Sequence, residues 1–91
     1  MFTLFPLGQI VATPGALAAL ERSQQPASCF LARHAIGDWG ELDPPDVAEN
    51  EYGMVQGLRL LSSYKTVAGE KVWIITEADR SATTLLLPEE Y

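Results

Sequence analysis

The sequence predicts a single α+β domain over residues 1–91, in which three helices pack against an antiparallel sheet. Helix signals occupy residues 13–57 and strand signals occupy residues 59–87, and such separate runs are typical of α+β proteins. The length of 91 residues suffices for one domain but not for two. The hydrophobic share of 47% is too high for a disordered chain. We expect the sheet to combine a C-terminal three-stranded meander with one strand near the N-terminus.

The first two elements are a strand and a helix. Residues 5–12 include the β-branched pair Ile10 and Val11, which favours a strand. Thr13 followed by Pro14 is typical of a helix start, because the hydroxyl can cap the first turn and proline lacks only an N–H that has no helical partner there. We expect this helix to end near Arg22.

The second helix is expected to begin at Pro26 and to end near Gly37. Its apolar face is formed by residues at helical spacing: Ala27, Phe30, Leu31 and His34.

The third helix is expected to begin after Asp43 as the capping residue and to end near Gly57, with two prolines in its first turn. Its inward stripe is expected to contain Val47, Met54, Val55 and Leu58. This assignment places on the solvent side Asp46, Glu49 and Gly53.

The meander consists of strands over residues 59–66, 71–77 and 82–87, joined by turns at 67–70 and 79–81. The middle strand is apolar at four successive positions: Val72, Trp73, Ile74 and Ile75. A strand without a polar face is typical of the interior of a sheet. We therefore expect residues 71–77 to lie between the other two strands, with both faces covered, and the last residues to form a tail.

Several classes of protein are disfavoured by composition. Cys29 is the only cysteine, which excludes an internal disulfide and a cysteine-based zinc site within one chain. No apolar run reaches the roughly 20 residues of a membrane span. The first six residues lack the basic region of a signal peptide. We expect a cytoplasmic protein without a cofactor or a metal.

The formal net charge of −6 is concentrated in one stretch. Residues 38–51 contain no lysine or arginine but six acids, and elsewhere acids and bases balance. An acidic surface is repelled by phosphate, so direct binding to nucleic acids or to anionic membranes is not expected. The acids of this stretch are Asp38, Glu41, Asp43, Asp46, Glu49 and Glu51.

Several blocks of the sequence carry a family resemblance. They are Thr13-Pro14-Gly15, Leu31-Ala32-Arg33-His34 followed by Gly37-Asp38-Trp39-Gly40, residues 73–81, and Leu87-Pro88-Glu89-Glu90-Tyr91. Over residues 8–91 the chain resembles a family of small bacterial proteins that are frequent on plasmids and other mobile elements. Some members are labelled as type I restriction–modification subunits. The family has no established activity, so the resemblance implies a setting and not a mechanism.

The preferred functional hypothesis is a regulatory protein that binds a basic protein partner. The candidate binding residues are Asp38, Trp39, Glu41, Asp43, Asp46 and Glu49. Such charges steer association with a basic partner, and tryptophan is enriched at interface hot spots. Two alternatives remain open at this point: the acidic face is only solvated, or Trp39 closes one end of the core.

The other hypothesis is a small domain that binds a ligand or a metal and could use it in catalysis, although no catalytic residue is assigned and an enzyme is the less favoured class. The site would use His34 and Asp38 together with the turn residues Glu77, Asp79 and Arg80. Imidazole can transfer protons, and carboxylates suit hard cations. The competing interpretation is a partly buried His34 with one hydrogen-bond partner, such as Asp38, and an exposed charged turn.

Overall fold

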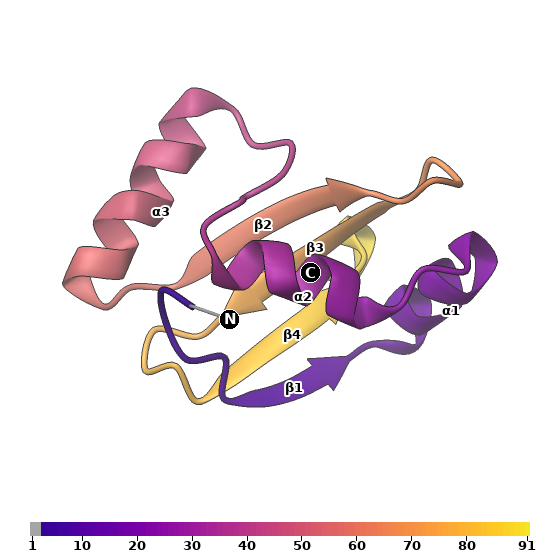
Figure 1. Ribbon diagram of the computed structural model, residues 1–91, viewed down its shortest axis with the longest axis horizontal. Helices are drawn as coiled ribbons and strands as arrows, with labels where there is room; N and C mark the ends of the chain where they lie inside the picture. Colours follow the sequence, from indigo (N-terminus) through magenta and orange to yellow (C-terminus); the bar gives the residue numbers. More distant parts are fainter. Residues whose placement is uncertain (1–2) are drawn as a thin grey trace.

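The computed structural model describes residues 3–91, which form three helices and one four-stranded sheet (Figure 1). Met1 and Phe2, which begin the stretch considered as a signal peptide, lie outside the described residues. Within residues 3–91, no helix is both long enough and apolar enough to cross a membrane. The combination of three helices with one sheet confirms the α+β class.

The elements follow the expected order along the chain. The strands are β1 (Gln9–Ala12), β2 (Leu60–Lys65), β3 (Lys71–Thr76) and β4 (Ala82–Leu86). The helices are α1 (Pro14–Ser23), α2 (Ala27–Ala35) and α3 (Pro44–Gln56), and a short 3-10 helix, η1 (Pro88–Glu90), closes the chain. The expected C-terminal tail is thus partly helical, and β1 is shorter than expected.

The helix starts follow their local signals with two exceptions. Thr13 caps α1, because its Oγ1 accepts a hydrogen bond from the N–H of Ala16 at 3.1 Å. Asp43 occupies the capping position of α3, but its carboxylate makes no capping bond. Pro26 precedes α2 as its capping residue instead of beginning the helix. Gly57 ends α3 in the left-handed region, at φ 71°.

The sheet has the strand order β1-β4-β3-β2 and is mixed. The interior position of β3 is confirmed, with β2 and β4 antiparallel to it. The expectation of a purely antiparallel sheet is wrong, because β1 runs parallel to β4. Tight turns force neighbouring strands of the meander to be antiparallel, whereas no short turn joins β1 to β4 and fixes its direction.

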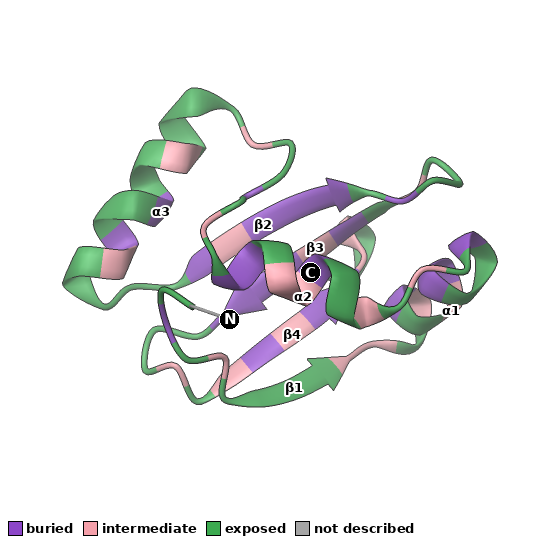
Figure 2. Cartoon of the chain, viewed as in Figure 1, coloured by how far each residue is buried: buried purple, intermediate pink, exposed green. Residues whose placement is uncertain are grey.

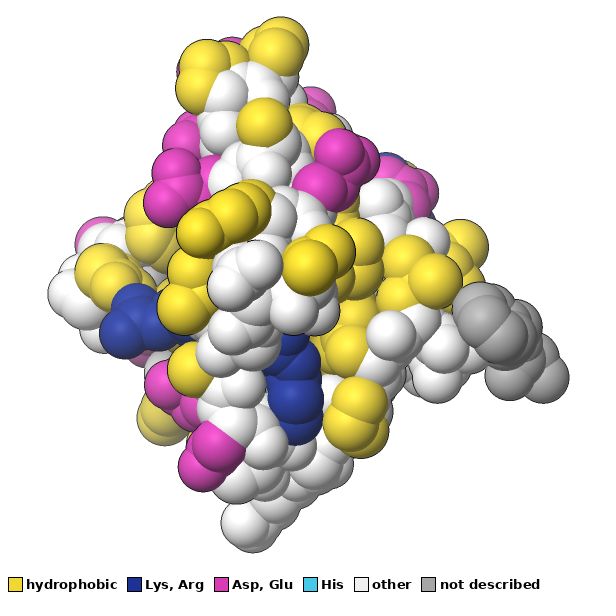
Figure 3. All heavy atoms as spheres, turned by 90° about the vertical axis from the view of Figure 1, so that its left-hand side faces the viewer, with side chains coloured by type: hydrophobic (Ala, Val, Ile, Leu, Met, Phe, Trp, Pro, Cys, Tyr) yellow, Lys and Arg dark blue, Asp and Glu magenta, His cyan; other side chains and the backbone are white. Residues whose placement is uncertain are grey.

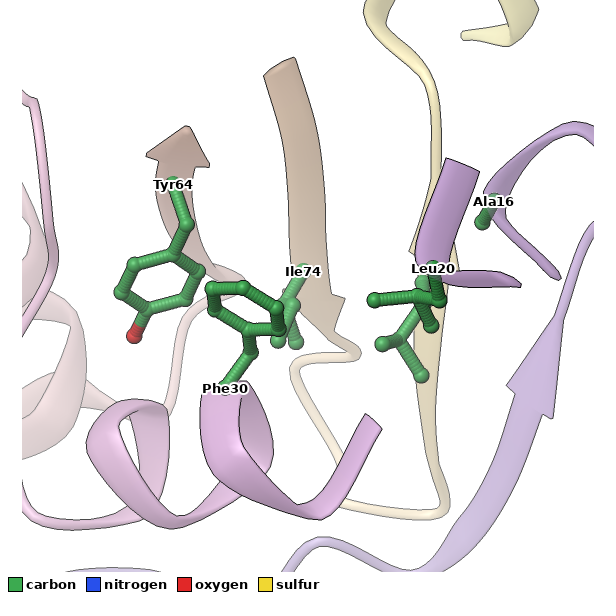
Figure 4. Close-up of a cluster of buried hydrophobic side chains, with 6 residues drawn as sticks. Ala16, Leu20, Phe30, Tyr64 and Ile74 are labelled. Atoms are coloured by element: carbon green, nitrogen blue, oxygen red, sulfur yellow. The ribbon is translucent and has the colours of Figure 1, made fainter. Parts of the chain in front are cut away.

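One face of the sheet holds the main core. Figure 1 shows α2 lying across this face, with α1 and α3 towards its two ends. Side chains from helices and strands meet there (Figure 4), and the buried cluster consists of Ala16, Leu20, Phe30, Tyr64, Ile74 and Leu85. Burying a side chain of leucine or phenylalanine size stabilises a fold by about 1.5–3 kcal/mol. This cluster therefore fixes α1 and α2 on the sheet.

A second buried cluster lies where α3 meets the sheet. It contains Phe5, Trp39 and Leu60, with partly buried Val47 and Met54 packed against it. The Trp39 ring stacks on Phe5 with 6.2 Å between centroids, and the indole is buried. Trp39 therefore belongs to the core, and the alternative of an exposed interface anchor is wrong.

The opposite face of the sheet carries no long helix. The chain end passes behind the sheet in Figure 1, and the Tyr91 ring lies 5.8 Å from that of Trp73. On this face Ile75 is buried and Trp73 is half-buried. The expectation that both faces of β3 are substantially covered is met, with thinner cover on this side.

Candidate functional site

The exposed helix α3 carries two of the five acids predicted to bind a partner, Asp46 and Glu49. Its inward positions are Asn50 and Gly53, both buried, whereas Val55 is 80% exposed. The expected stripe is therefore wrong at Val55 and at Leu58, which is also exposed, and Gly53 does not face solvent. Glycine at position 53 allows a close approach to Leu60, because a Cβ there would lie 3.2 Å from the side chain of Leu60, which would have to shift.

Polar contacts, more than apolar burial, fix the position of α3. The amide of Asn50 donates to the backbone oxygen of Leu61 at 2.6 Å and accepts from its N–H at 3.0 Å. Arg80 holds the other end of the helix, since its guanidinium donates to the carbonyl oxygens of Leu58 at 2.7 Å and Gly53 at 3.2 Å. These bonds orient α3 so that a fixed set of side chains points away from the molecule.

The outward side of α3 is an apolar ridge with acidic flanks. We call the outward residues Ala48, Tyr52 and Val55 the α3 ridge; their spacing of four and three residues places them on one line along the helix. The Tyr52 side chain is 60% exposed. Glu49 and Glu51 are exposed beside the ridge and make no ion pair within the described part of the chain.

The other predicted acids divide into two groups. Glu41, Asp43 and Asp46 are exposed in or just before α3 and add to its negative charge. Asp38 pairs instead with Arg33 at 2.7 Å, and this hydrogen bond holds the pKa of the Asp38 carboxyl below its usual range. The charge of Asp38 is therefore compensated by Arg33 and adds little to the acidic face.

Figure 3 views the molecule from the side of α3. Hydrophobic and acidic side chains lie side by side over much of this face, and dark blue lysine and arginine side chains cover a smaller part of it. Figure 2 shows that most of α3 is exposed, in contrast to β2 and β3, which are mostly buried. The face thus combines exposed apolar groups with uncompensated negative charge.

His34, central to the alternative hypothesis, is buried in the core. Its imidazole is 0% exposed and bonds to two hydroxyls, Ser62 and Thr76, not to Asp38. The expectation of a partly buried histidine with one partner is therefore wrong. Burial, helped by the positive charge of Arg80, lowers the His34 pKa from 6.5 to about 4.

The hydrogen bonds around His34 run in one direction. The carbonyl oxygen of Leu7 only accepts, so Thr83 donates to it at 2.7 Å. Thr83 must then accept from Thr76 at 2.8 Å, and Thr76 must accept from His34 Nε2 at 2.8 Å. The neutral ring therefore carries its proton on Nε2, and Nδ1 accepts from Ser62 at 2.6 Å.

Ser62 beside His34 resembles a nucleophile and its base, but neither side chain reaches solvent. A substrate has no access to this pair, and all its hydrogen-bonding groups are used within the core. The geometry therefore supports a structural role for His34.

The turn residues of the alternative hypothesis also have structural partners. The carboxylate of Asp79 accepts from the N–H of Ser81 at 3.0 Å, which is an Asx turn. Arg80 is engaged with the end of α3, as described above. Glu77 is exposed and lines a pocket on the opposite face of the sheet from His34. The structure does not bring these residues and His34 to one opening.

That pocket is shallow, with a volume of about 280 Å³. Arg59 donates to the hydroxyl of Tyr91 at 2.5 Å across one side of it. Within residues 3–91, no three histidine, cysteine, aspartate or glutamate side chains gather as a metal site. The lining residues are Arg59, Ile75, Glu77, Thr84, Leu86, Glu90 and Tyr91.

The outward residues Tyr52 and Val55 were not among the predicted site residues. Their signal in the sequence is the spacing Ala48, Tyr52, Val55, which forms a second apolar line besides the predicted stripe. Periodicity alone does not tell which of two lines faces the core.

No protein-family model, curated protein or solved structure matches the chain.

Proposed function

We propose that the protein is a binding or regulatory protein that docks α3 into a groove of a basic protein partner. The observation that carries this proposal is the α3 ridge itself: Tyr52 and Val55 are exposed on a helix whose flanking charges are all negative. An exposed helix with apolar anchors at such spacing is the usual ligand of a hydrophobic groove.

The two parts of the face have different roles in this proposal. Tyr52 and Val55 enter the groove, where desolvation of aromatic and aliphatic groups supplies affinity. Glu49 and Glu51 meet lysine or arginine at its rim, where charge pairs set orientation and raise the association rate. The expected partner therefore has an apolar groove edged by positive charge.

The biological setting is proposed from the family resemblance. Enzymes that act on nucleic acids carry basic surfaces for the phosphate backbone. An acidic helix suits such a surface, so we propose an inhibitor or accessory protein of a nucleic-acid enzyme in a mobile-element or defence system.

The test is a quantitative pull-down from the native host with matched variants. Tyr52→Ala combined with Val55→Ser should weaken capture of the partner at least 30-fold, corresponding to about 2 kcal/mol. Val67→Ser, which changes an exposed apolar residue on the β2–β3 turn, is the control for the ridge.

The contribution of charge is tested separately. Glu49→Lys with Glu51→Lys should slow association and weaken its dependence on salt, because screening acts over about 8–10 Å. Glu21→Lys with Glu89→Lys makes the same change in net charge at other exposed positions and should have little effect. If the ridge and charge variants retain the same partners as the wild type, α3 is only a solvated helix.

A further inference from the structure

The two edges of the sheet differ in whether their outward backbone groups have hydrogen-bond partners. At the β2 edge, Asn50 satisfies both backbone groups of Leu61, as described above. The neighbouring groups of Ser63 are also satisfied, because its N–H donates to the oxygen of Trp39 at 3.0 Å and its oxygen accepts from the N–H of Glu41 at 2.6 Å. This edge is closed to further strands.

The β1 edge is open. Gln9 donates to Ser81 at 2.9 Å and Thr13 donates to Leu85 at 3.0 Å, so alternate residues of β1 face β4. The backbone groups of Ile10 and Ala12 consequently point away from the sheet. In Figure 1 nothing lies beyond β1, and Figure 2 shows the strand as exposed.

The side chains of β1 are uncharged and, apart from Gln9, apolar. Ile10 is 44% exposed on one face of the sheet and Val11 is 43% exposed on the other. The only charged residues among the first 32 are Glu21 and Arg22. Natural open edges are usually guarded by charge, proline or a covering segment. The strand Gln9–Ala12 contains neither a charged residue nor a proline.

We propose that β1 pairs with β1 of a second copy of the chain, in antiparallel orientation about a two-fold axis at Val11. In this register Ile10 lies opposite Ala12 of the other copy. Their outward N–H and C=O groups form four backbone hydrogen bonds, and the two Val11 side chains contact each other across the axis. The two sheets become one continuous sheet of eight strands.

A second copy suits this edge better than a charged partner does. The strand is neutral, and the acidic stretch lies with α3 beside β2, at the far edge of the sheet. Three strand spacings, about 14 Å, separate β1 from β2, which exceeds the Debye length at physiological salt. Repulsion between the two acidic stretches is therefore screened, and both α3 ridges remain free in the dimer.

Sedimentation velocity of the purified full chain tests the association. The contact is short, so we expect a reversible dimer that appears between about 5 and 500 µM, at the weak end of specific interfaces. Val11→Lys should stay monomeric with an unchanged circular dichroism spectrum, whereas Val67→Lys should dimerise like the wild type. A wild-type chain that stays monomeric over this range would overturn the proposal.

Cysteine cross-linking tests the register in a Cys29→Ser background, which removes the only native thiol. Val11→Cys should form an intermolecular disulfide, because paired residues at such positions have Cα atoms about 4.5 Å apart. Ile10→Cys should not, since the two Ile10 positions are separated by about 8 Å. Equal cross-linking of both variants, or none by Val11→Cys, would reject this interface even if the chain dimerises elsewhere.

Discussion

At the scale of single residues, the core is organised by a polar chain as well as by apolar packing. His34, Ser62, Thr76 and Thr83 are all buried, and each hydrogen bond between them has one possible direction. A buried polar network stabilises a fold only when every member is satisfied. Here the carbonyl of Leu7 terminates the chain of donors, so a neutral imidazole with its proton on Nε2 completes it.

Protonation of His34 should destabilise the fold. In the unfolded chain the imidazole has a pKa of about 6.5, whereas burial lowers it to about 4 in the folded protein. Between these values only the unfolded chain binds the proton, so the stability contributed by His34 is fully present above pH 6.5 and is lost as the pH falls towards 4. The loss over this interval should be roughly 3 kcal/mol.

Urea unfolding of the wild type and of His34→Gln between pH 7 and 4.5 measures this effect. The variant should be less stable at pH 7 but should lack the histidine-dependent slope. Parallel pH profiles for the two proteins would contradict the assignment. The Nε2–H tautomer can be checked directly from the ¹⁵N shifts of the single histidine.

At the scale of elements, one amide makes both hydrogen bonds that join the middle of α3 to β2, while Arg80 holds the end of the helix. Asn50 makes both of its bonds to the edge of β2, and few apolar groups of the helix are buried. The amide thus takes the place of a fifth strand at this position. A helix held in this way is sensitive to loss of one side chain.

Asn50→Ala should lower the free energy of unfolding by about 2–3 kcal/mol, because two hydrogen bonds are lost and the backbone groups of Leu61 are left unpaired. The exposed β2 edge should also promote aggregation. Chemical denaturation and light scattering measure the two effects. Gln56→Ala, at an exposed position of the same helix, is the control, and equal stabilities would show that Asn50 does not fix α3.

The elements that sequence reasoning predicts well are those with local signals. Thr13 marks the start of α1, Gly57 the end of α3, and the tight turns of the meander place β3 between its neighbours. The errors concern contacts between distant segments. The parallel pairing of β1 with β4, and the inward position of Asn50, depend on partners far along the chain.

The candidate site likewise combines features that are visible in the sequence with features that depend on contacts between distant segments. The acidic stretch is visible in the sequence because charge is a property of composition. Burial of Trp39 and exposure of Val55 are not, since Trp39 is buried by contacts with Phe5 and His34 and Val55 is exposed because the opposite side of α3, with Asn50 and Gly53, faces β2. The ion pair of Asp38 with Arg33 is likewise not visible in the sequence, because it forms across the end of α2.

At the scale of the whole molecule, the two edges of the sheet differ in charge. The acids of α3 and the preceding loop lie beside β2, and the uncharged strand β1 lies at the other edge. The proposed partner and the proposed second copy would therefore use different surfaces. Binding at one surface leaves the other accessible.

The distribution of basic residues leads to a negative prediction about nucleic acids. Arg22 and Arg33 are paired with Glu70 and Asp38. Arg80 is bonded to backbone oxygens, as described above. Lys65 and Lys71 lie opposite each other at the end of the β2–β3 pair, and Arg59 lines the pocket that also contains Glu77 and Glu90.

The isolated protein should therefore not bind DNA at physiological salt. Proteins with useful affinity neutralise roughly 6–10 phosphates, whereas two neighbouring lysines on a chain of net charge −6 neutralise very few. Fluorescence anisotropy with a labelled duplex at low micromolar protein is the measurement, repeated at low salt. Any weak binding of the wild type at low salt should disappear at physiological salt. It should also be absent at low salt from the double variant Lys65→Glu with Lys71→Glu. Binding that survives physiological salt would mean that a surface other than the acidic face governs the interactions of this protein.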